Sequence, residues 1–229
     1  MSNSSQQRRL ETPDGFGPGT PQFTAWTKAY YQQVETYDWV DAADRLQGIE
    51  SLFHRKRQRE IRGLFARYGQ ARGLVLDAGC GTGLNLRHLP EGSVGLDINP
   101  RNIELVAKRL PTHPAVLGDI EAMPFDDEAF STVLCTEVLE HLPNPELALA
   151  EIRRVLAPGG CLIGMVPARA PVWKLRFLSR SCPHTEPFHN EYRVNEVRAM
   201  MTDAGFQTER ANYSLGWFSV IFIAHKPSV

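Results

Sequence analysis

The stretch VLDAGCGTG, residues 75–83, decides the fold. An apolar run over residues 73–79 leads into glycines with the spacing G-x-G-x-G. At the carboxyl end of a strand, glycines let the backbone approach a ligand without a Cβ in the way. Residue 84 is Leu, so the dinucleotide fingerprint G-x-G-x-x-G does not match, and no Gly-Lys-Ser/Thr marks a P-loop. Asp77, just before the glycines, would repel a pyrophosphate and favours a ligand that carries an ammonium group.

Strand and helix patterns alternate on the carboxyl side of this turn. Apolar runs predict strands over 73–79, 93–99, 114–120, 130–137, 161–167, 207–215 and 217–227. Helical patterns begin near Leu84 and cover 99–110, 146–156 and 194–206, with Pro158 expected to end the third. We therefore predict an α/β fold: a three-layer, Rossmann-like, doubly wound sheet of seven strands whose last strand is antiparallel.

The chain before the turn has a different character. Residues 1–22 are rich in Ser, Gln, Gly and Pro, which predicts a flexible tail. Aromatic and aliphatic residues at helical spacing over 23–70 predict a cap of two or three helices. We expect a single domain over 23–229, with its Rossmann-like core over 73–229.

Composition narrows the classes of function. The 25 Lys and Arg balance 26 Asp and Glu, so a generally basic nucleic-acid binder is not expected. No apolar stretch approaches the roughly 18–20 residues of a membrane span, and the first fifteen residues lack the apolar core of a secretory signal. The four cysteines form no C-x-x-C pair. These features predict a reduced, cytoplasmic protein.

Two further carboxylates follow the next two strands. Asp97 ends the second strand, where a carboxylate is placed to accept both hydroxyls of a ribose. Asp119 ends the third strand, where its side chain is placed to accept from an exocyclic amine and the backbone N–H of Ile120 to donate to a ring nitrogen. Each aspartate alone is equally compatible with a helix N-cap or a turn. Three such features at successive strand ends favour a nucleoside-like ligand.

These motifs resemble those of the class I S-adenosylmethionine (SAM)-dependent methyltransferases. VLDAGCGTG (75–83) resembles the glycine motif, GLDIN (95–99) the ribose-binding motif and GDIEAMPF (118–125) the adenine-binding motif. Residues 130–160 resemble the branch that contains the ubiquinone and menaquinone biosynthesis methyltransferases. The resemblance covers about residues 73–167, and it implies SAM as cofactor and S-adenosylhomocysteine (SAH) as product.

The resemblance also implies roles for individual residues. The implied cofactor contacts are Asp77, Gly79, Gly81 and Glu137 near the methionine part, Asp97 at the ribose, Ile98 against the adenine ring, and Asp119 and Ile120 at the adenine edge. The segment 30–38 resembles an aromatic lid, in which Tyr30 or Tyr31 closes over the cofactor.

Methyl transfer from a sulfonium is an in-line displacement, so the protein mainly has to align the acceptor with the methyl group. A hydroxyl or acidic-carbon acceptor also benefits from a general base, and His141 is the candidate. If residues 137–141 are helical, Glu137, Glu140 and His141 share one face. The alternative is that Glu140 and His141 only orient the loop by hydrogen bonding.

Two clusters raise the question of a metal ion. The E-x-x-E-H string at 137–141 resembles a metal-ligand pattern of ubiquinone-biosynthesis O-methyltransferases, but similar strings occur in relatives taken to be metal-free. The second cluster is His184, Glu186 and His189, and Pro187 argues against a helical site there. We expect no metal at either cluster.

Two basic segments, 54–62 and 169–180, carry apolar residues as well. They fit peripheral contact with an anionic membrane, closure over an amphiphilic substrate, or solvated helix faces. The sequence thus predicts a methyltransferase for a small-molecule or lipid-like acceptor, cytoplasmic or peripheral to a membrane. The alternatives are a protein or RNA methyltransferase and a non-catalytic SAM-binding module; a nicotinamide-dependent oxidoreductase is disfavoured by Leu84.

Overall fold

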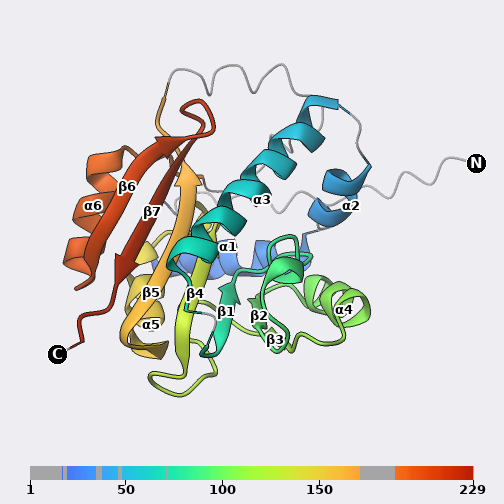
Figure 1. Ribbon diagram of the computed structural model, residues 1–229, viewed down its shortest axis with the longest axis horizontal. Helices are drawn as coiled ribbons and strands as arrows, with labels where there is room; N and C mark the ends of the chain where they lie inside the picture. The colour runs from blue at the N-terminus through green and yellow to red at the C-terminus, as the bar shows by residue number, and fades with distance from the viewer. Residues whose placement is uncertain are drawn as a thin grey trace, which may run out of the picture.

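The sheet at the centre of the protein has the strand order β3-β2-β1-β4-β5-β7-β6 (Figure 1). The structure is a computed structural model that describes residues 17, 20–34, 38–45, 48–70, 72–170 and 189–228. The strands are β1 (Val75–Ala78), β2 (Val94–Asp97), β3 (Ala115–Leu117), β4 (Phe130–Thr136), β5 (Leu156–Pro167), β6 (Gln207–Ser214) and β7 (Ser219–His225). Strand β7 is antiparallel to both of its neighbours, whereas all other pairs are parallel. The predicted seven-stranded sheet with an antiparallel last strand is confirmed.

Helices cover both faces of the sheet. Helices α3 (Gly48–Tyr68) and α4 (Pro100–Arg109) pack on one face, and α5 (Pro145–Val155) and α6 (Val194–Asp203) pack on the other. Successive side chains of a strand point to opposite faces. Val133 therefore packs with Ile152 of α5, while Leu134 packs with Ile61 of α3. Both faces of the central strands are buried, which explains why these strands read as nearly continuous apolar runs.

In the described ranges, three helices precede the sheet, where the sequence predicts the cap. They are α1 (Pro21–Gln33), α2 (Trp39–Asp44) and α3. The side chain of Thr20 accepts a hydrogen bond from the backbone N–H of Phe23 at 3.3 Å, which caps α1 and starts it at Pro21, two residues before the expected boundary. The division into a tail and a single domain stays a prediction, and residues 1–16 lie outside the described ranges.

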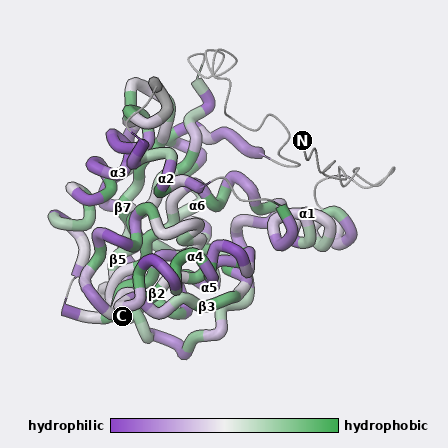
Figure 2. The backbone as a smooth tube through the Cα atoms, turned by 90° about the vertical axis from the view of Figure 1, so that its right-hand side faces the viewer, coloured by the Kyte–Doolittle hydropathy of each residue, from purple (hydrophilic) through white to green (hydrophobic). Residues whose placement is uncertain are grey.

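Helix α1 is held at the carboxyl ends of the strands by two asparagines. Asn99, which follows β2, donates through Nδ2 to the carbonyl of Tyr31 at 2.9 Å. Asn144, which follows β4, donates to Thr24 Oγ1 at 3.1 Å. Figure 2 shows α1 projecting from one side of the molecule. The cap therefore reaches the edge of the sheet where the predicted site lies.

The expected helix beginning near Leu84 is wrong. Residues 86–88 form a single turn of 3₁₀ helix instead. Few residues separate the glycine turn from Pro90, and Gly92 then adopts a left-handed φ of 83°. This connection leaves few residues for an α-helix before the return to β2, and a cavity lies between it and α3.

The expected end of the helix over 146–156 is also displaced. Helix α5 ends at Val155, and β5 starts at Leu156, so Pro158 lies within the strand rather than at the end of the helix. None of the helices in the described ranges combines the length and apolar character that crossing a bilayer requires.

Candidate functional site

The glycine turn after β1 leaves the strand with a left-handed backbone. Gly79, Gly81 and Gly83 have φ values of 79°, 52° and 90°. The backbone N–H groups of Gly79 and Cys80 both donate to the carbonyl of Leu96, at 2.8 and 2.9 Å. A Cβ on Gly79 would lie 2.3 Å from Val138 Cγ2. The glycines are therefore required by the turn itself, and the turn is anchored to β2.

Asp97 joins the end of β2 to this turn. Its Oδ2 accepts from the backbone N–H of Gly81 at 2.8 Å. Its Oδ1 accepts from the Asn99 backbone N–H and from Asn102 Nδ2, both at 2.9 Å. Burial raises the pKa of the Asp97 carboxyl, and these hydrogen bonds oppose that shift. The carboxylate that the sequence predicts to bind a ribose thus lies beside the glycine turn.

Asp77 lies at the same junction but is fully buried, with 1% of its surface exposed. Burial raises its pKa to about 7, the charge of Asp97 adds to this rise, and a hydrogen bond from the backbone of Leu86 opposes it. Its Oδ2 has no hydrogen-bond partner in the described part of the chain. A buried carboxylate oxygen without a partner is costly, and a ligand ammonium group would satisfy it.

Asp119 and Ile120 follow the third strand, as predicted. Asp119 also forms an ion pair that the sequence did not reveal. Lys28 of α1 places Nζ 2.6 Å from Asp119 Oδ2 and 2.5 Å from Glu121 Oε2. Ile120 is buried and Ile98 is half-buried. Of the adenine-edge candidates, Asp119 is therefore paired with α1 in this arrangement.

Glu137 follows β4 in a left-handed conformation, with a φ of 57°. Nη1 of Arg57, a residue of α3, lies 3.2 Å from Glu137 Oε2. The guanidinium of Arg57 also stacks over Trp39, 5.8 Å from the ring centroid. Trp39 in turn lies against the glycine turn, because a Cβ on Gly81 would be 3.5 Å from its Cδ1. Arg57, Trp39 and Lys28 were missed by sequence reasoning, since only folding brings the cap to these strand ends.

The proposed helical face of Glu137, Glu140 and His141 is wrong. Only residues 139–141 form a 3₁₀ turn, and Glu140 points into the interior, with 1% exposed. His141 instead faces the cap: its Nδ1 lies 2.9 Å from the hydroxyl of Tyr31. Tyr31, one of the two lid candidates, therefore contacts the candidate base, while Tyr30 packs edge-on against Tyr31.

The structure describes little of the second cluster. His184 and Glu186 lie outside the described ranges, as do Cys182 and most of the basic segment 169–180. His189 is described, and its ring centroid is 5.5 Å from that of His141. Within the described ranges, no three His, Cys, Asp or Glu side chains are grouped so as to hold a metal ion.

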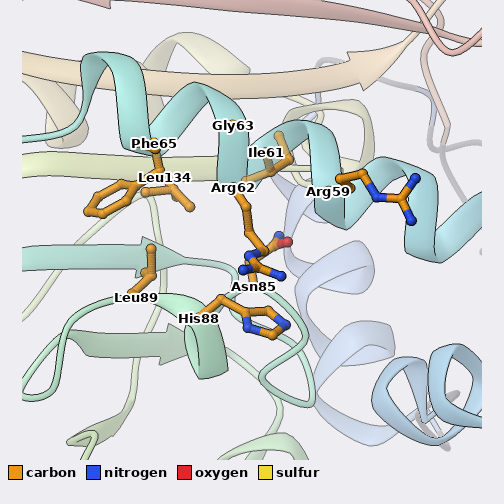
Figure 3. Close-up of a pocket in the computed structure, with 10 residues that line it drawn as sticks. Arg59, Ile61, Arg62, Gly63, Phe65, Asn85, His88, Leu89 and Leu134 are labelled. Atoms are coloured by element: carbon orange, nitrogen blue, oxygen red, sulfur yellow. The ribbon is translucent and has the colours of Figure 1, made fainter.

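A cavity of about 450 Å³ lies between α3 and the short connection after the glycine turn. Ile61, Phe65, Leu89 and Leu134 form apolar walls, and Arg59, Arg62, Asn85 and His88 add polar groups. Figure 3 shows Arg62, Asn85 and His88 pointing toward one another, whereas Arg59 points away. Asn85 Nδ2 donates to Thr136 Oγ1 at 2.9 Å, which links this cavity to the end of β4.

Known proteins share both sequence and fold with this chain. Residues 76–164 match the family described as "Methyltransferase domain". The chain is 43% identical over 93 residues to a phthiotriol/phenolphthiotriol dimycocerosates methyltransferase of Mycobacterium tuberculosis, covering 38% of this chain and 34% of that protein. It is 40% identical over 109 residues to a 37.1 kDa transposon protein of Streptomyces fradiae, covering 44% of this chain and 31% of that protein. The chain thus spans about a third of the length of these curated relatives.

Solved structures extend the likeness over most of the chain. A magnesium protoporphyrin IX methyltransferase from Synechocystis, solved with bound SAH, superposes with a TM-score of 0.65 and 18% identity, over 88% of this chain and 99% of that one. The cyclase SpnF superposes with a TM-score of 0.64 and 17% identity, over 77% and 83%. Residues 76–164 thus match a methyltransferase domain, and the fold is that of solved SAM-dependent methyltransferases, so the two findings support S-adenosylmethionine as the cofactor.

Proposed function

We propose that this chain transfers a methyl group from SAM to a small-molecule or lipid-like acceptor. The observation that carries the proposal is the convergence of Asp77, Asp97 and Asp119 on one edge of the sheet, beside a left-handed glycine turn. Asp77 Oδ2, buried and without a partner in the described ranges, fits the amino group of the methionine part. SAM would supply an already activated methyl group, so these residues need only bind and orient it.

Each strand end contributes a distinct contact in this proposal. Asp97 accepts the ribose hydroxyls, and Asp119 with the backbone of Ile120 holds the adenine edge against Ile98. Gly79 and Gly81 let the backbone approach the methionine part, near Glu137. When the ligand binds, Asp119 gives up part of its ion pair with Lys28 and binds the adenine edge instead. The cap then excludes water from the site.

The cavity beside α3 supports an amphiphilic acceptor. Its walls are apolar, while Arg62, Asn85 and His88 converge at one side (Figure 3). Such a site suits an elongated apolar molecule with an anionic or hydroxylated end. The lipid after which the Mycobacterium relative is named is consistent with this chemical class. Peripheral contact with a membrane would bring such an acceptor to the protein.

Calorimetric titration with SAH, after treatment with a chelator and with NADH as control, tests the cofactor. We expect micromolar binding of SAH alone, after which a screen for methyl transfer from labelled SAM would start with quinols and lipids. Binding of NADH, or of neither compound, would contradict the proposal. SAH binding without transfer to any acceptor would favour a non-catalytic SAM-binding module.

The raised pKa of Asp77 predicts that SAH binding depends on pH. Because its pKa is raised to about 7, the carboxyl is largely neutral below that pH and charged above it. We expect the affinity for SAH to rise as the pH increases through about 7, while the amino group of the ligand stays protonated. Asp77→Asn should flatten this dependence in calorimetry, and exposed Asp203→Asn is the matched control. A steep dependence that survives Asp77→Asn would exclude Asp77 as its source.

The stability of the ligand-free protein should change in the opposite direction. An unfolded Asp titrates near 3.8, whereas folded Asp77 titrates near 7, so the unfolded chain binds fewer protons between these values. The contribution of Asp77 to the free energy of unfolding therefore falls as the pH rises from about 4 to about 7. Urea titrations of wild type and Asp77→Asn at several pH values measure this contribution.

His141 is proposed as the general base for a hydroxyl or acidic-carbon acceptor. His141→Ala should lower kcat about 100-fold with the acceptor found in the screen, because proton removal in the transition state is lost. SAH affinity should change little. Tyr31→Phe, which removes only the hydroxyl beside Nδ1, should have a smaller effect on kcat. If His141→Ala weakened SAH binding and left kcat intact, the base assignment would be wrong.

A further inference from the structure

The turn between β6 and β7 has an unusual backbone. Leu215, Gly216 and Trp217 have successive positive φ values of 53°, 70° and 74°. This region is unfavourable for a large side chain such as Trp. The turn nevertheless sends the two large residues to different places: Leu215 is 8% exposed, whereas Trp217 is 63% exposed. The strained backbone therefore presents an indole to the surroundings.

Trp217 is rigidly placed as well as exposed. Its ring stacks on that of Tyr213 at a centroid distance of 5.3 Å and an interplanar angle of 8°. Tyr213 is itself 38% exposed. An exposed stacked pair loses little rotamer entropy when it inserts into another phase. We call Tyr213 and Trp217 the aromatic tip.

The amino-terminal part and the middle of α3 lie beside this turn. Phe53 packs edge-on against Phe218 with a centroid distance of 5.8 Å, and Ser214 hydrogen-bonds Glu60. Leu52, next to Phe53, is 65% exposed. The contact between Phe53 and Phe218 therefore brings an exposed leucine and an exposed tryptophan to the same end of the molecule.

The solvent side of α3 is cationic. The basic face consists of Arg55, Lys56 and Arg59, all of which are exposed. Across the part of the chain that the structure describes, none of these three forms an ion pair with a carboxylate. Figure 2 shows hydrophilic residues along this helix. The basic face is therefore available to an anionic surface.

Topology places the aromatic tip at the same edge of the sheet as the candidate site. Strand β7 is antiparallel to both β5 and β6, so β6 runs in the same direction as β1 to β5. The carboxyl end of β6, which leads into the turn, thus lies at the edge where β1, β2 and β4 also end. A surface bound by the tip would face the site.

We propose that the aromatic tip, Leu52 and the basic face together dock this protein on an anionic lipid bilayer. Indole and phenol rings partition to the boundary between headgroups and acyl chains, and each cation near an anionic surface adds attraction. An apolar anchor and a cationic patch together give stable attachment, whereas either alone gives only marginal binding. The bilayer also matches the positive charge of the basic face, which an apolar protein partner would not neutralise. Docking does not depend on methyl transfer.

Co-sedimentation of the full chain with vesicles tests the docking. We expect binding to phosphatidylcholine vesicles that contain phosphatidylglycerol, little binding to phosphatidylcholine alone, and loss of binding at high salt. Trp217→Ala should reduce partitioning about tenfold. Lys56→Glu should reduce it about fivefold or more.

Matched controls lie at the opposite edge of the sheet, where the chain enters β1. Leu52→Ala should also reduce partitioning, and Leu74→Ala, at a residue 44% exposed, is its control. Arg72→Glu is the control for Lys56→Glu. Neither control should change partitioning. Equal binding to neutral and anionic vesicles would overturn the role of the basic face. Absence of vesicle binding together with a dimer that Trp217→Ala dissociates would identify a protein interface instead.

The docking and the proposed function fail in distinguishable ways. Trp217→Ala and Lys56→Glu should leave the SAH affinity in solution unchanged, because neither residue belongs to the candidate site. Thermal melting of each variant separates lost docking from lost folding. Vesicle binding in a protein that fails to bind SAH would support the docking and contradict only the cofactor assignment.

Discussion

Asp97→Ala is expected to weaken SAH binding at least about tenfold while the protein stays folded. In the proposed complex, the carboxylate accepts two ribose hydroxyls, and hydrogen bonds to a charged group contribute about 1.5–3 kcal/mol. The same carboxylate already accepts from Gly81, Asn99 and Asn102, so its oxygens are fixed in position before the ligand arrives. Calorimetric titration with SAH measures the loss, and circular dichroism checks the fold.

The control must separate ribose binding from support of the glycine turn. Asn102→Ala removes one donor to Asp97 Oδ1 and leaves the carboxylate in place. We expect it to weaken SAH binding far less than Asp97→Ala does. If both variants lost the same affinity, Asp97 would act by holding the turn. Unchanged affinity in Asp97→Ala would remove the ribose assignment.

Gly79→Ala is expected to destabilise the protein by about 2–5 kcal/mol. The left-handed φ of 79° costs an L-residue about 1–2 kcal/mol. The new Cβ would also lie 2.3 Å from Val138 Cγ2, and such overpacking costs about 1–3 kcal/mol. For a domain of this size the melting temperature should fall by about 4–20 °C. Urea and thermal unfolding, monitored by circular dichroism, measure both quantities.

Gly92→Ala is the matched control for this substitution. Gly92 has a nearly identical φ of 83°, but a Cβ there would meet no atom within 4 Å. It should show only the cost of the left-handed backbone, about 1–2 kcal/mol. Equal destabilisation by the two alanines would show that the Val138 side chain moves aside at little cost. The close approach of Val138 to the turn would then not require a glycine at position 79.

The strand-end carboxylates were predictable because they depend on local patterns. An apolar run of strand length fixes where a strand ends, and parallel strands end at one edge of the sheet. Asp77, Asp97 and Asp119 could therefore be placed together from the sequence. The expected helix near Leu84 failed for the opposite reason: a helical pattern does not reveal how few residues the connection leaves for a helix.

The cap contacts were not predictable from the chain. Lys28 and Asp119 are 91 positions apart by their numbers, and Tyr31 and His141 are 110 apart. No local pattern relates such residues, because their approach depends on how α1 and α3 pack across the strand ends. Glu137 is similar: its left-handed conformation, rather than a helix, directs it to Arg57.

The sequence by itself determined the sheet, the glycine turn, the three aspartates and the resemblance to SAM-dependent methyltransferases, since all of these follow from residue types at short, regular spacings. Tertiary structure alone decided the partners of these aspartates, the buried environment that raises the pKa of Asp77, and the cavity beside α3. It also brought the strained turn at Trp217 next to the basic face of α3. The physical reason is that burial, electrostatic coupling and shape depend on distances in space, which local sequence does not encode.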